Sequence, residues 1–359
     1  MSESIIQTLQ AIVSAVNVHS ASSFSFAGGA PVNVGPNGFG QSKNVRPQTP
    51  VEPLVQALQS TLYSSCYVRP FDGSNGYPSG IQPLQAASDP GFPARLSQAN
   101  CSRDHWEPGW IVHQLGHGGM IFVHKGERHR AVQPGEFAGA GMAPQPNQMV
   151  SLQVLRESFQ LQPGFYFVFG ETISDQYDDF SIVRFYFHLK PEGAPLLIKK
   201  LTTDLNLFHV PFRMKCLTDP AQYVRSDSAV LYVSQRFFRI TATLLATLAG
   251  AQWLRPSTPF FTRELAPGLA VAEDPGNGES FGMHRCRMVS EGIVDAWLQG
   301  SQSPEARMTA VRQRFLQNGL TLERPYISAA SRDVFEFPAP VEFSLEKPES
   351  APAMAAGAK

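Results

Sequence analysis

The sequence predicts an α+β fold, and three observations support that class. Stretches with the period-two alternation of strands fall into two blocks. Stretches with helical spacing precede, separate and follow those blocks without strict strand–helix alternation, which disfavours a doubly wound sheet. The 29 glycines and 29 prolines among 359 residues indicate long irregular segments between the packed elements. We expect a small N-terminal region with helices and an antiparallel meander, followed by a larger mixed β-sheet with flanking helices.

Composition narrows the function classes. Hydrophobic residues make up 43% of the chain, enough for a sizeable core. Lys and Arg number 29 against 30 Asp and Glu, so no overall field draws the chain to nucleic acid or to an anionic membrane. No run reaches the roughly 18 apolar residues of a membrane span. The 4 cysteines are scattered without a CxxC pair, which is typical of free thiols in a reducing cytoplasm. We therefore expect a cytoplasmic protein without nucleic-acid or membrane partners.

The chain is expected to open with a short helix and a polar segment. Apolar residues repeat at helical spacing at Ile5, Leu9, Ile12, Val13 and Val16. Residues 19–49 are rich in Ser, Gly, Pro and Asn, and they hold too few apolar groups to offset the entropy of ordering them. We interpret residues 1–50 as a flexible N-terminal segment with a short helix.

Residues 51–147 are expected to hold a second helix and small antiparallel strands. The helix begins near Pro53 and ends near Cys66. Three short strands follow, separated by the turn sequences GHGG and KGE. They are residues 110–114, 120–124 and 128–132.

The same region carries five histidines, which raise the question of a metal site. They are His105, His113, His117, His124 and His129. Imidazole is a common zinc ligand, but no acidic or cysteine partner stands at metal-ligand spacing. We interpret them as solvated strand or loop histidines and predict neither a metal nor another cofactor.

Residues 148–330 are expected to form the main α+β domain, and residues 331–359 a partly disordered tail. We expect residues 158–170 and 181–189 to pair as strands, and a helix over residues 195–208 to pack on the sheet. The remaining expected elements are strands at 210–217, 229–233 and 269–271, a buried helix at 237–251, and a loop leading into a helix with a basic first turn in GNGESFGMHRCRMVSEGIVDAWL. The Ala- and Pro-rich stretch 346–359 should be disordered and dispensable.

The stretch from Val183 to Arg239 carries the most informative side chains. They are His188, Lys190, Arg213, Lys215, Tyr223 and Arg225. Because alternate residues of a strand point to one face, His188 should share a face with Lys190, and Arg213 with Lys215. A cationic, proton-transferring set of this kind suits a phosphorylated or otherwise anionic ligand.

Three separated motifs carry a family resemblance. They are GFYFVFGETISDQYDDFSIVRFYFHLKPEGAPLLIKKLT, HVPFRMKCLTDPAQYVRSDSAVLYV and SFGMHRCRMVSEGI. Together they resemble the HopA-like family, named for a type III effector of plant-pathogenic bacteria. In peptide-modifying gene clusters, members of this family act beside a phosphotransferase-like kinase that phosphorylates Ser or Thr of a precursor peptide. The HopA-like partner then eliminates phosphate to leave a dehydroamino acid, as in the biosynthesis of lanthipeptides and related RiPPs.

The resemblance therefore implies a phosphothreonine or phosphoserine lyase with a kinase and a phosphorylated precursor peptide as partners. The family is also distantly similar to the phosphothreonine lyases among type III effectors. Elimination needs a base for the Cα proton, an acid near the leaving oxygen and cations around the phosphate, but no metal or redox cofactor.

The residue inventory suits this chemistry. Lys215 is the first choice of base, with Lys190 second, because neighbouring cations depress the pKa of a lysine. His188 is the candidate acid, and Tyr223 would share the proton or hold the bridging oxygen. The expected phosphate clamp is Arg213, Arg225, His284, Arg285 and Arg287, the last three at the opening of a helix.

Each role has a structural alternative. His188 could be a buried imidazole bonded to backbone, and Arg225 could form a structural ion pair with Asp227. Lys190 could be a solvated strand end, and Tyr223 could be a packing residue. Two other functions stay open for the chain as a whole. One is a non-catalytic scaffold that binds a phosphopeptide or the kinase, and the other is a translocated type III effector that acts on a host protein.

Overall fold

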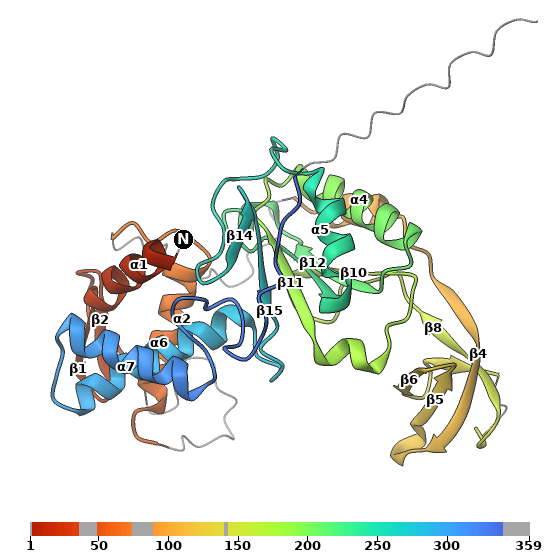
Figure 1. Cartoon of the computed structure of the whole chain (residues 1–359), viewed down its shortest axis with the longest axis horizontal. Coiled ribbons are helices and arrows are strands. Elements are labelled where there is room, and N and C mark those ends of the chain that lie inside the picture. The colour runs from red at the N-terminus through yellow and green to blue at the C-terminus, as the bar shows by residue number, and fades with distance from the viewer. Residues whose placement is uncertain (1, 36–48, 74–88, 140–142, 340–359) are drawn as a thin grey trace, which may run out of the picture.

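The computed structural model describes residues 2–35, 49–73, 89–139 and 143–339, and a seven-stranded sheet lies at its centre (Figure 1). The strands lie in the order β14, β15, β11, β13, β12, β10, β9. Their bounds are β14 Arg263–Ala266, β15 Leu269–Glu273, β11 Ile182–Phe187, β13 Ala229–Ser234, β12 Phe212–Leu217, β10 Phe165–Phe169 and β9 Glu157–Ser158. Every pairing between neighbours is antiparallel, so the sheet is not the mixed sheet expected from the sequence. Separate helices and antiparallel sheets confirm the α+β class.

The two faces of this sheet differ because apolar residues alternate with polar and aromatic ones along its strands. One face carries Phe185, Met214 and Leu231, all fully buried. It packs against α4 (Gly193–Leu207) and α5 (Phe238–Ala246). The Phe185 and Phe238 rings stack with centroids 5.5 Å apart. The opposite face carries arginine, lysine and tyrosine, and only part of it is covered.

The N-terminal and C-terminal segments pack together beside the sheet (Figure 1). This body contains the helices α1 Ser2–Ser14, α2 Glu52–Leu62, α6 Phe281–Leu298 and α7 Pro304–Gln317, and a π-helical turn, η1, at Tyr63–Tyr67. Its small sheet is β1 Val16–Ser20, β2 Ser23–Phe26 and β3 Val32–Asn33. Buried Arg307 of α7 donates to the backbone oxygens of Val13 and Val16 and so holds the end of α1. The linear domain division expected from the sequence therefore cuts through this body.

The small sheet β1–β3 spans residues 16–33, and from residue 19 onward it occupies the stretch that the sequence predicted to be a flexible linker. Val18, Phe24 and Phe26 are at most 5% exposed, because the neighbouring helices cover them. Tertiary packing supplies the burial that the local composition lacks. The rest of that predicted linker, residues 36–48, lies outside the described residues.

A second antiparallel sheet of five strands confirms the meander and extends it. Its strands are β6 Arg128–Val132, β5 Ile121–Lys125, β4 His105–Leu115, β8 Met149–Val154 and β7 Phe137–Ala138, in that order. Trp110, Val112, Ile121 and Val123 are fully buried in its own apolar cluster. Because β8 belongs to this sheet, the sheet crosses the expected boundary at residue 147.

Several sequence-based expectations need correction. The strands β10 and β11 do not pair with each other, because β12 and β13 lie between them. A short 3-10 segment, η3 (Gln176–Phe180), precedes β11. The sequence predicted neither α3 (Phe92–Ala99) nor α7 nor the edge strand β14. Within the described ranges, no helix has the length and apolar content that a bilayer crossing requires. The expected disordered tail, residues 346–359, lies outside the described residues.

Candidate functional site

The partly covered face of the central sheet gathers cations at matched positions. Arg213 of β12 pairs in register with Tyr232 of β13, which in turn pairs with Arg184 of β11. Directly opposite residues lie on one face, so the three form a row across the sheet. The two guanidinium carbons lie 4.7 Å (Arg213) and 5.4 Å (Arg184) from the Tyr232 ring centroid. We call this surface, with Lys215 in the next row, the cationic face.

Lys215 is the amine of the cationic face. It is half-buried, and its Nζ donates to Gln162 Oε1 at 2.9 Å and lies 4.5 Å from the Phe165 ring centroid. In the described part of the chain no carboxylate forms an ion pair with it. Burial lowers the pKa of Lys215 to about 8, and the charges of Arg184, Arg225 and Arg213 act in the same direction, against the opposing carboxylate of Asp227. A substantial fraction of this amine is therefore neutral near physiological pH.

The two arginines of the row differ in whether a carboxylate already pairs with their charge. Arg213 is exposed, and the described ranges contain no carboxylate paired with it. Arg184 is buried and forms an ion pair with Asp274 at 2.5 Å. The cationic face therefore presents one free guanidinium, that of Arg213, beside the Lys215 amine.

Arg225 forms the structural ion pair that the sequence left as an alternative. Its Nε and Nη2 donate to the two carboxylate oxygens of Asp227 at 2.8 and 2.9 Å. Nη2 also contacts the Tyr63 hydroxyl at 2.9 Å, and that hydroxyl donates to Asp227 at 3.1 Å. Arg225 thus contributes positive potential to Lys215, but its hydrogen-bonding edge is occupied.

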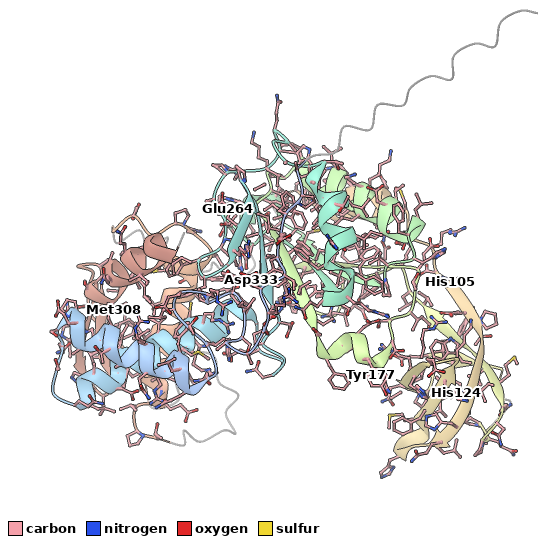
Figure 2. All side chains as sticks on the ribbon, in the orientation of Figure 1. His105, His124, Tyr177, Glu264, Met308 and Asp333 are labelled. Atoms are coloured by element: carbon pink, nitrogen blue, oxygen red, sulfur yellow. The ribbon has the colours of Figure 1, made fainter. Side chains whose placement is uncertain are left out.

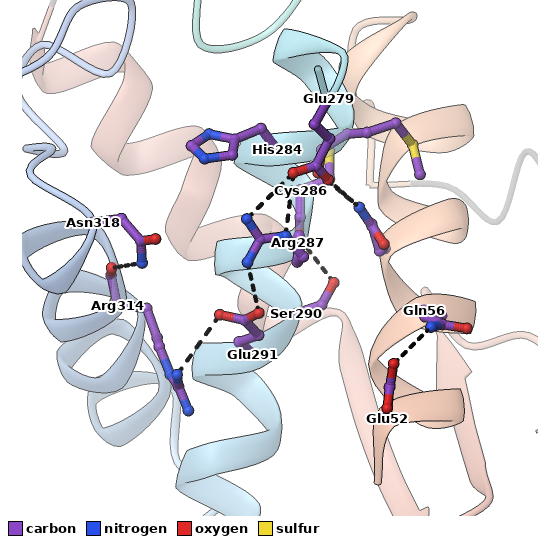
Figure 3. Close-up of polar contacts among 12 residues, drawn as sticks. Glu52, Gln56, Glu279, His284, Cys286, Arg287, Ser290, Glu291, Arg314 and Asn318 are labelled. Carbon is purple, nitrogen blue, oxygen red and sulfur yellow. Dashed lines mark hydrogen bonds and ion pairs between the residues drawn. The ribbon is translucent and has the colours of Figure 1, made fainter. Parts of the chain in front are cut away.

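The start of α6 does not present the three cations that were expected there to hold phosphate. Arg287 is held between Glu279 and Glu291, at 3.2 and 2.9 Å (Figure 3). Arg285 is 2% exposed, donates to the backbone oxygen of Pro325 at 2.7 Å and contacts His284. Burial, reinforced by the neighbouring arginines, lowers the pKa of His284 to about 4, so its imidazole is neutral at pH 7.

His188 is a buried imidazole bonded to the backbone, the structural alternative that the sequence left open. Its Nδ1 lies 3.0 Å from the backbone oxygen and 2.9 Å from the hydroxyl of Ser257, which fixes the proton on Nδ1. Burial lowers the pKa of the imidazole, and the backbone hydrogen bond to Ser257 only partly opposes this. Nε2 is buried and has no hydrogen-bond partner among the described residues. A neutral, buried imidazole does not match the expected proton donor.

Lys190 and Tyr223 lie away from the cationic face. The strand β11 ends at Phe187, and Lys190 follows in the turn before α4, where its N–H donates to Trp253. No contact among the described residues links the Lys190 side chain to Lys215. The buried Tyr223 hydroxyl donates to the backbone oxygen of Leu217 at 2.8 Å, so it belongs to the core.

Sequence reasoning missed Arg184 and three tyrosines that shape the face. Tyr186 of β11 lies two residues from Arg184 on the same face, and the positive charge of Arg184 partly opposes the rise that burial causes in the pKa of Tyr186. Burial also raises the pKa of Tyr67 of η1, and the nearby Tyr186 acts in the same direction. Tyr232 lies between the two arginines of the row. A signal was present, because Arg184 and Tyr186 alternate with apolar residues along the strand in the same way as Arg213 and Lys215.

Three of the meander histidines lie close together on the five-stranded sheet. The ring centroids of His113, His124 and His129 are 5.8 to 6.1 Å apart, and Figure 2 labels His124. Among the residues that the structure describes, no group of His, Cys, Asp and Glu is arranged to hold a metal ion.

Comparison with known proteins points to one family. Residues 156–327 match the model of the HopA1 effector protein family, a range that contains the whole central sheet and all nine predicted site residues. Comparison with curated proteins gave no match.

Two solved structures are similar in part. One is an effector protein from Pseudomonas syringae pv. tomato strain DC3000, with 22% identity and a TM-score of 0.36 over 46% of this chain and 62% of that chain. The matched region thus spans less than two thirds of that chain. The other is an effector protein from Pseudomonas syringae pv. syringae strain 61, with 16% identity and a TM-score of 0.38 over 68% of this chain and 83% of that chain. The family match confirms the resemblance seen in the sequence motifs: residues 156–327 of this chain match the HopA1 effector protein family.

Proposed function

We propose that this protein is a lyase that eliminates phosphate from phosphoserine or phosphothreonine in a peptide and leaves a dehydroamino acid. The observation that carries the proposal is the Lys215 amine, half-buried on the cationic face with a pKa lowered to about 8. An amine of that pKa can remove a weakly acidic proton at neutral pH, which an ordinary lysine cannot do efficiently.

The reaction balances with the residues at hand. Lys215 Nζ takes the proton from Cα, and the electron pair of that C–H bond forms the Cα=Cβ double bond. The Cβ–O bond breaks, and phosphate leaves with its electron pair. The chemistry needs a base and cations, but no redox step.

Arg213 is the residue best suited to hold the phosphate. It is exposed, lies on the same face as Lys215 two residues along β12, and has no carboxylate partner among the described residues. A guanidinium can donate two parallel hydrogen bonds to phosphate oxygens and offset the charge that develops on the leaving group. Arg184 and Arg225 add positive potential at Lys215. Their ion pairs with Asp274 and Asp227 hold the two guanidinium groups in place.

The roles first expected for Lys190, His188 and Tyr223 are not part of this proposal. Nor do His284, Arg285 and Arg287 act as a clamp in it, since their side chains are buried or paired. In their place, the proposal assigns the proton transfer to Lys215 and the phosphate contact to Arg213.

A phosphopeptide substrate implies a phosphotransferase that produces it. We infer a kinase partner and a cytoplasmic precursor peptide as the setting, in line with RiPP maturation of the lanthipeptide type. The family description favours a second setting, in which the same elimination acts on a phosphoprotein of a host cell after translocation. The two settings share the site and differ only in the substrate.

The test is the product formed from a synthetic phosphothreonine peptide, read by mass spectrometry. Wild type should remove phosphoric acid from the peptide. Lys215→Arg keeps the charge but cannot act as a base near pH 8, so it should bind the peptide without eliminating phosphate. Lys199→Ala, at an exposed position on α4, is the matched control and should behave as wild type.

Three outcomes would contradict the proposal. Return of a free hydroxyl would mean hydrolysis. Tight binding by wild type without any product would mean a scaffold. Elimination by Lys215→Arg at the normal rate would mean that another residue is the base.

A further inference from the structure

We propose that a groove at one end of the central sheet binds an acidic segment of the peptide substrate, a few residues from the phosphorylated side chain. The groove has a volume of about 800 Å³. It lies where β13 ends and β11 begins, between η3, the start of α5 and residues 331–334. Its role as a substrate site rests on the proposed lyase function, whereas its affinity for an acidic peptide does not.

The charges that line the groove leave two arginines free. Asp178 forms an ion pair with Arg236 at 2.6 Å, whereas Asp175 accepts the backbone N–H of Tyr177 at 2.9 Å and keeps its negative charge. With three arginines against two aspartates in the lining, the groove stays positive by one charge. Arg239 and Arg332 are exposed, and in the described ranges neither has a carboxylate partner. Two unmatched guanidinium groups in one groove are complementary to carboxylates.

The helix α5 adds to this preference. Arg239 lies in its first turn, and the N-terminal end of a helix carries partial positive charge. The arginine side chain and the helix end therefore favour an anion at the same place.

Exposed apolar side chains that line the groove favour binding of a peptide over binding of a small anion. Tyr177 is 66% exposed and Val334 is 39% exposed, and both line the groove. Figure 2 labels Tyr177 on η3, below the central sheet in that view. Exposed aromatic and aliphatic groups beside free arginines suit a segment in which an acidic residue neighbours an apolar one.

The groove and the proposed base are joined by one strand. Ser234 lines the groove and is four residues from Val230, the register partner of Lys215. At about 3.3 Å per residue, this separation is roughly 13 Å. An extended peptide rises by a similar amount per residue, so its acidic residue would stand about four positions from the phosphothreonine.

The probes are two labelled phosphothreonine peptides that differ in charge alone. One carries Glu–Leu pairs centred four positions before and after the phosphothreonine, and the other carries Gln–Leu pairs there. Dissociation constants are measured by fluorescence anisotropy, and dehydration of each peptide is followed by mass spectrometry.

We expect wild type to bind the Glu peptide about five- to tenfold more tightly than the Gln peptide, since two exposed charge pairs each contribute a modest factor. The double variant Arg239→Ala/Arg332→Ala should lose this preference. Arg312→Ala, on the surface of α7, is the matched control and should keep it. Lys215→Arg should keep it as well, because the groove does not contain the base.

The outcomes separate this inference from the lyase proposal. Equal affinity of wild type for the two peptides, or an unchanged preference in the double variant, would overturn the groove assignment even if both peptides are dehydrated. Selective binding of the Glu peptide without dehydration would overturn the lyase proposal and leave the groove assignment standing.

Discussion

Replacement of Lys215 by methionine should stabilise the fold while it abolishes the proposed activity. Burial lowers the pKa of Lys215 from its usual value of 10.5 to about 8, so the folded protein holds a charged amine against a free-energy cost at pH 7. One pKa unit corresponds to about 1.4 kcal/mol, which sets an upper limit of about 3 kcal/mol. The side chain is only half-buried, and solvent screening reduces the expected gain to about 1–2 kcal/mol.

The gain should depend on pH in a defined direction. Between pH 8 and 10.5 the unfolded chain binds more protons at Lys215 than the folded chain does. The stability of wild type therefore rises with pH across that window, and the cost of the buried charge is complete only below pH 8. Since methionine carries no proton, the advantage of Lys215→Met should shrink as the pH rises from about 8 towards 10.5.

Urea unfolding of both proteins at pH 7 and at about pH 9.5 measures this directly. The tyrosines and cysteines that also titrate at high pH are common to both proteins and cancel in the difference. Lys199→Met, at an exposed position on α4, should leave the free energy of unfolding within about 0.5 kcal/mol of wild type. A Lys215→Met protein that is less stable than wild type at pH 7, or whose advantage is the same at both pH values, would refute the reasoning.

Three further substitutions test the packing around the site. Gly282→Ala would bring a Cβ to 2.3 Å from the Tyr67 ring and should lower the free energy of unfolding by about 1–3 kcal/mol, measured by urea denaturation. Arg225→Ala leaves buried Asp227 without its cation and should cost about 3–5 kcal/mol in the same assay. Tyr223→Phe removes one buried hydrogen bond and should cost about 1 kcal/mol, while the elimination rate per folded molecule stays unchanged.

Each of these has its own control or contrary result. Gly35→Ala is the control for Gly282→Ala: its added Cβ would meet no atom within 4 Å, so it should leave the free energy of unfolding unchanged. If Arg225→Ala unfolds at the wild-type urea concentration, the ion pair is not structural. If Tyr223→Phe folds normally but loses elimination, the hydroxyl has a chemical role despite its backbone partner.

Local pattern was enough to place the elements that carry the proposed chemistry. The strands predicted at residues 210–217 and 229–233 correspond to β12 and β13, and the predicted shared face of Arg213 and Lys215 follows from the first of them. The helical period predicted α4 within two residues at each end, because its apolar stripe is long and regular. Such signals depend only on neighbours in the sequence, so the chain alone reveals them.

The order of strands and the surroundings of each cation depend on contacts between distant segments. Nothing local indicates that β11 pairs with β13 and β15 instead of β10. The prediction that Lys190 shares a strand face with His188 was wrong, because the strand β11 ends at Phe187. Buried Arg285 donates to the backbone oxygen of Pro325, which lies 40 residues further along the chain.

The pH dependence of elimination most directly tests the claim that the neutral Lys215 amine is the base. With a phosphothreonine peptide, kcat/KM should rise about tenfold per pH unit below pH 8 and level off above it, since the pKa of Lys215 is about 8. Arg213→Gln removes a nearby positive charge and should move the inflection to higher pH. A profile that is flat between about pH 6 and 9 in wild type, or one that Lys215→Arg reproduces, would contradict the account.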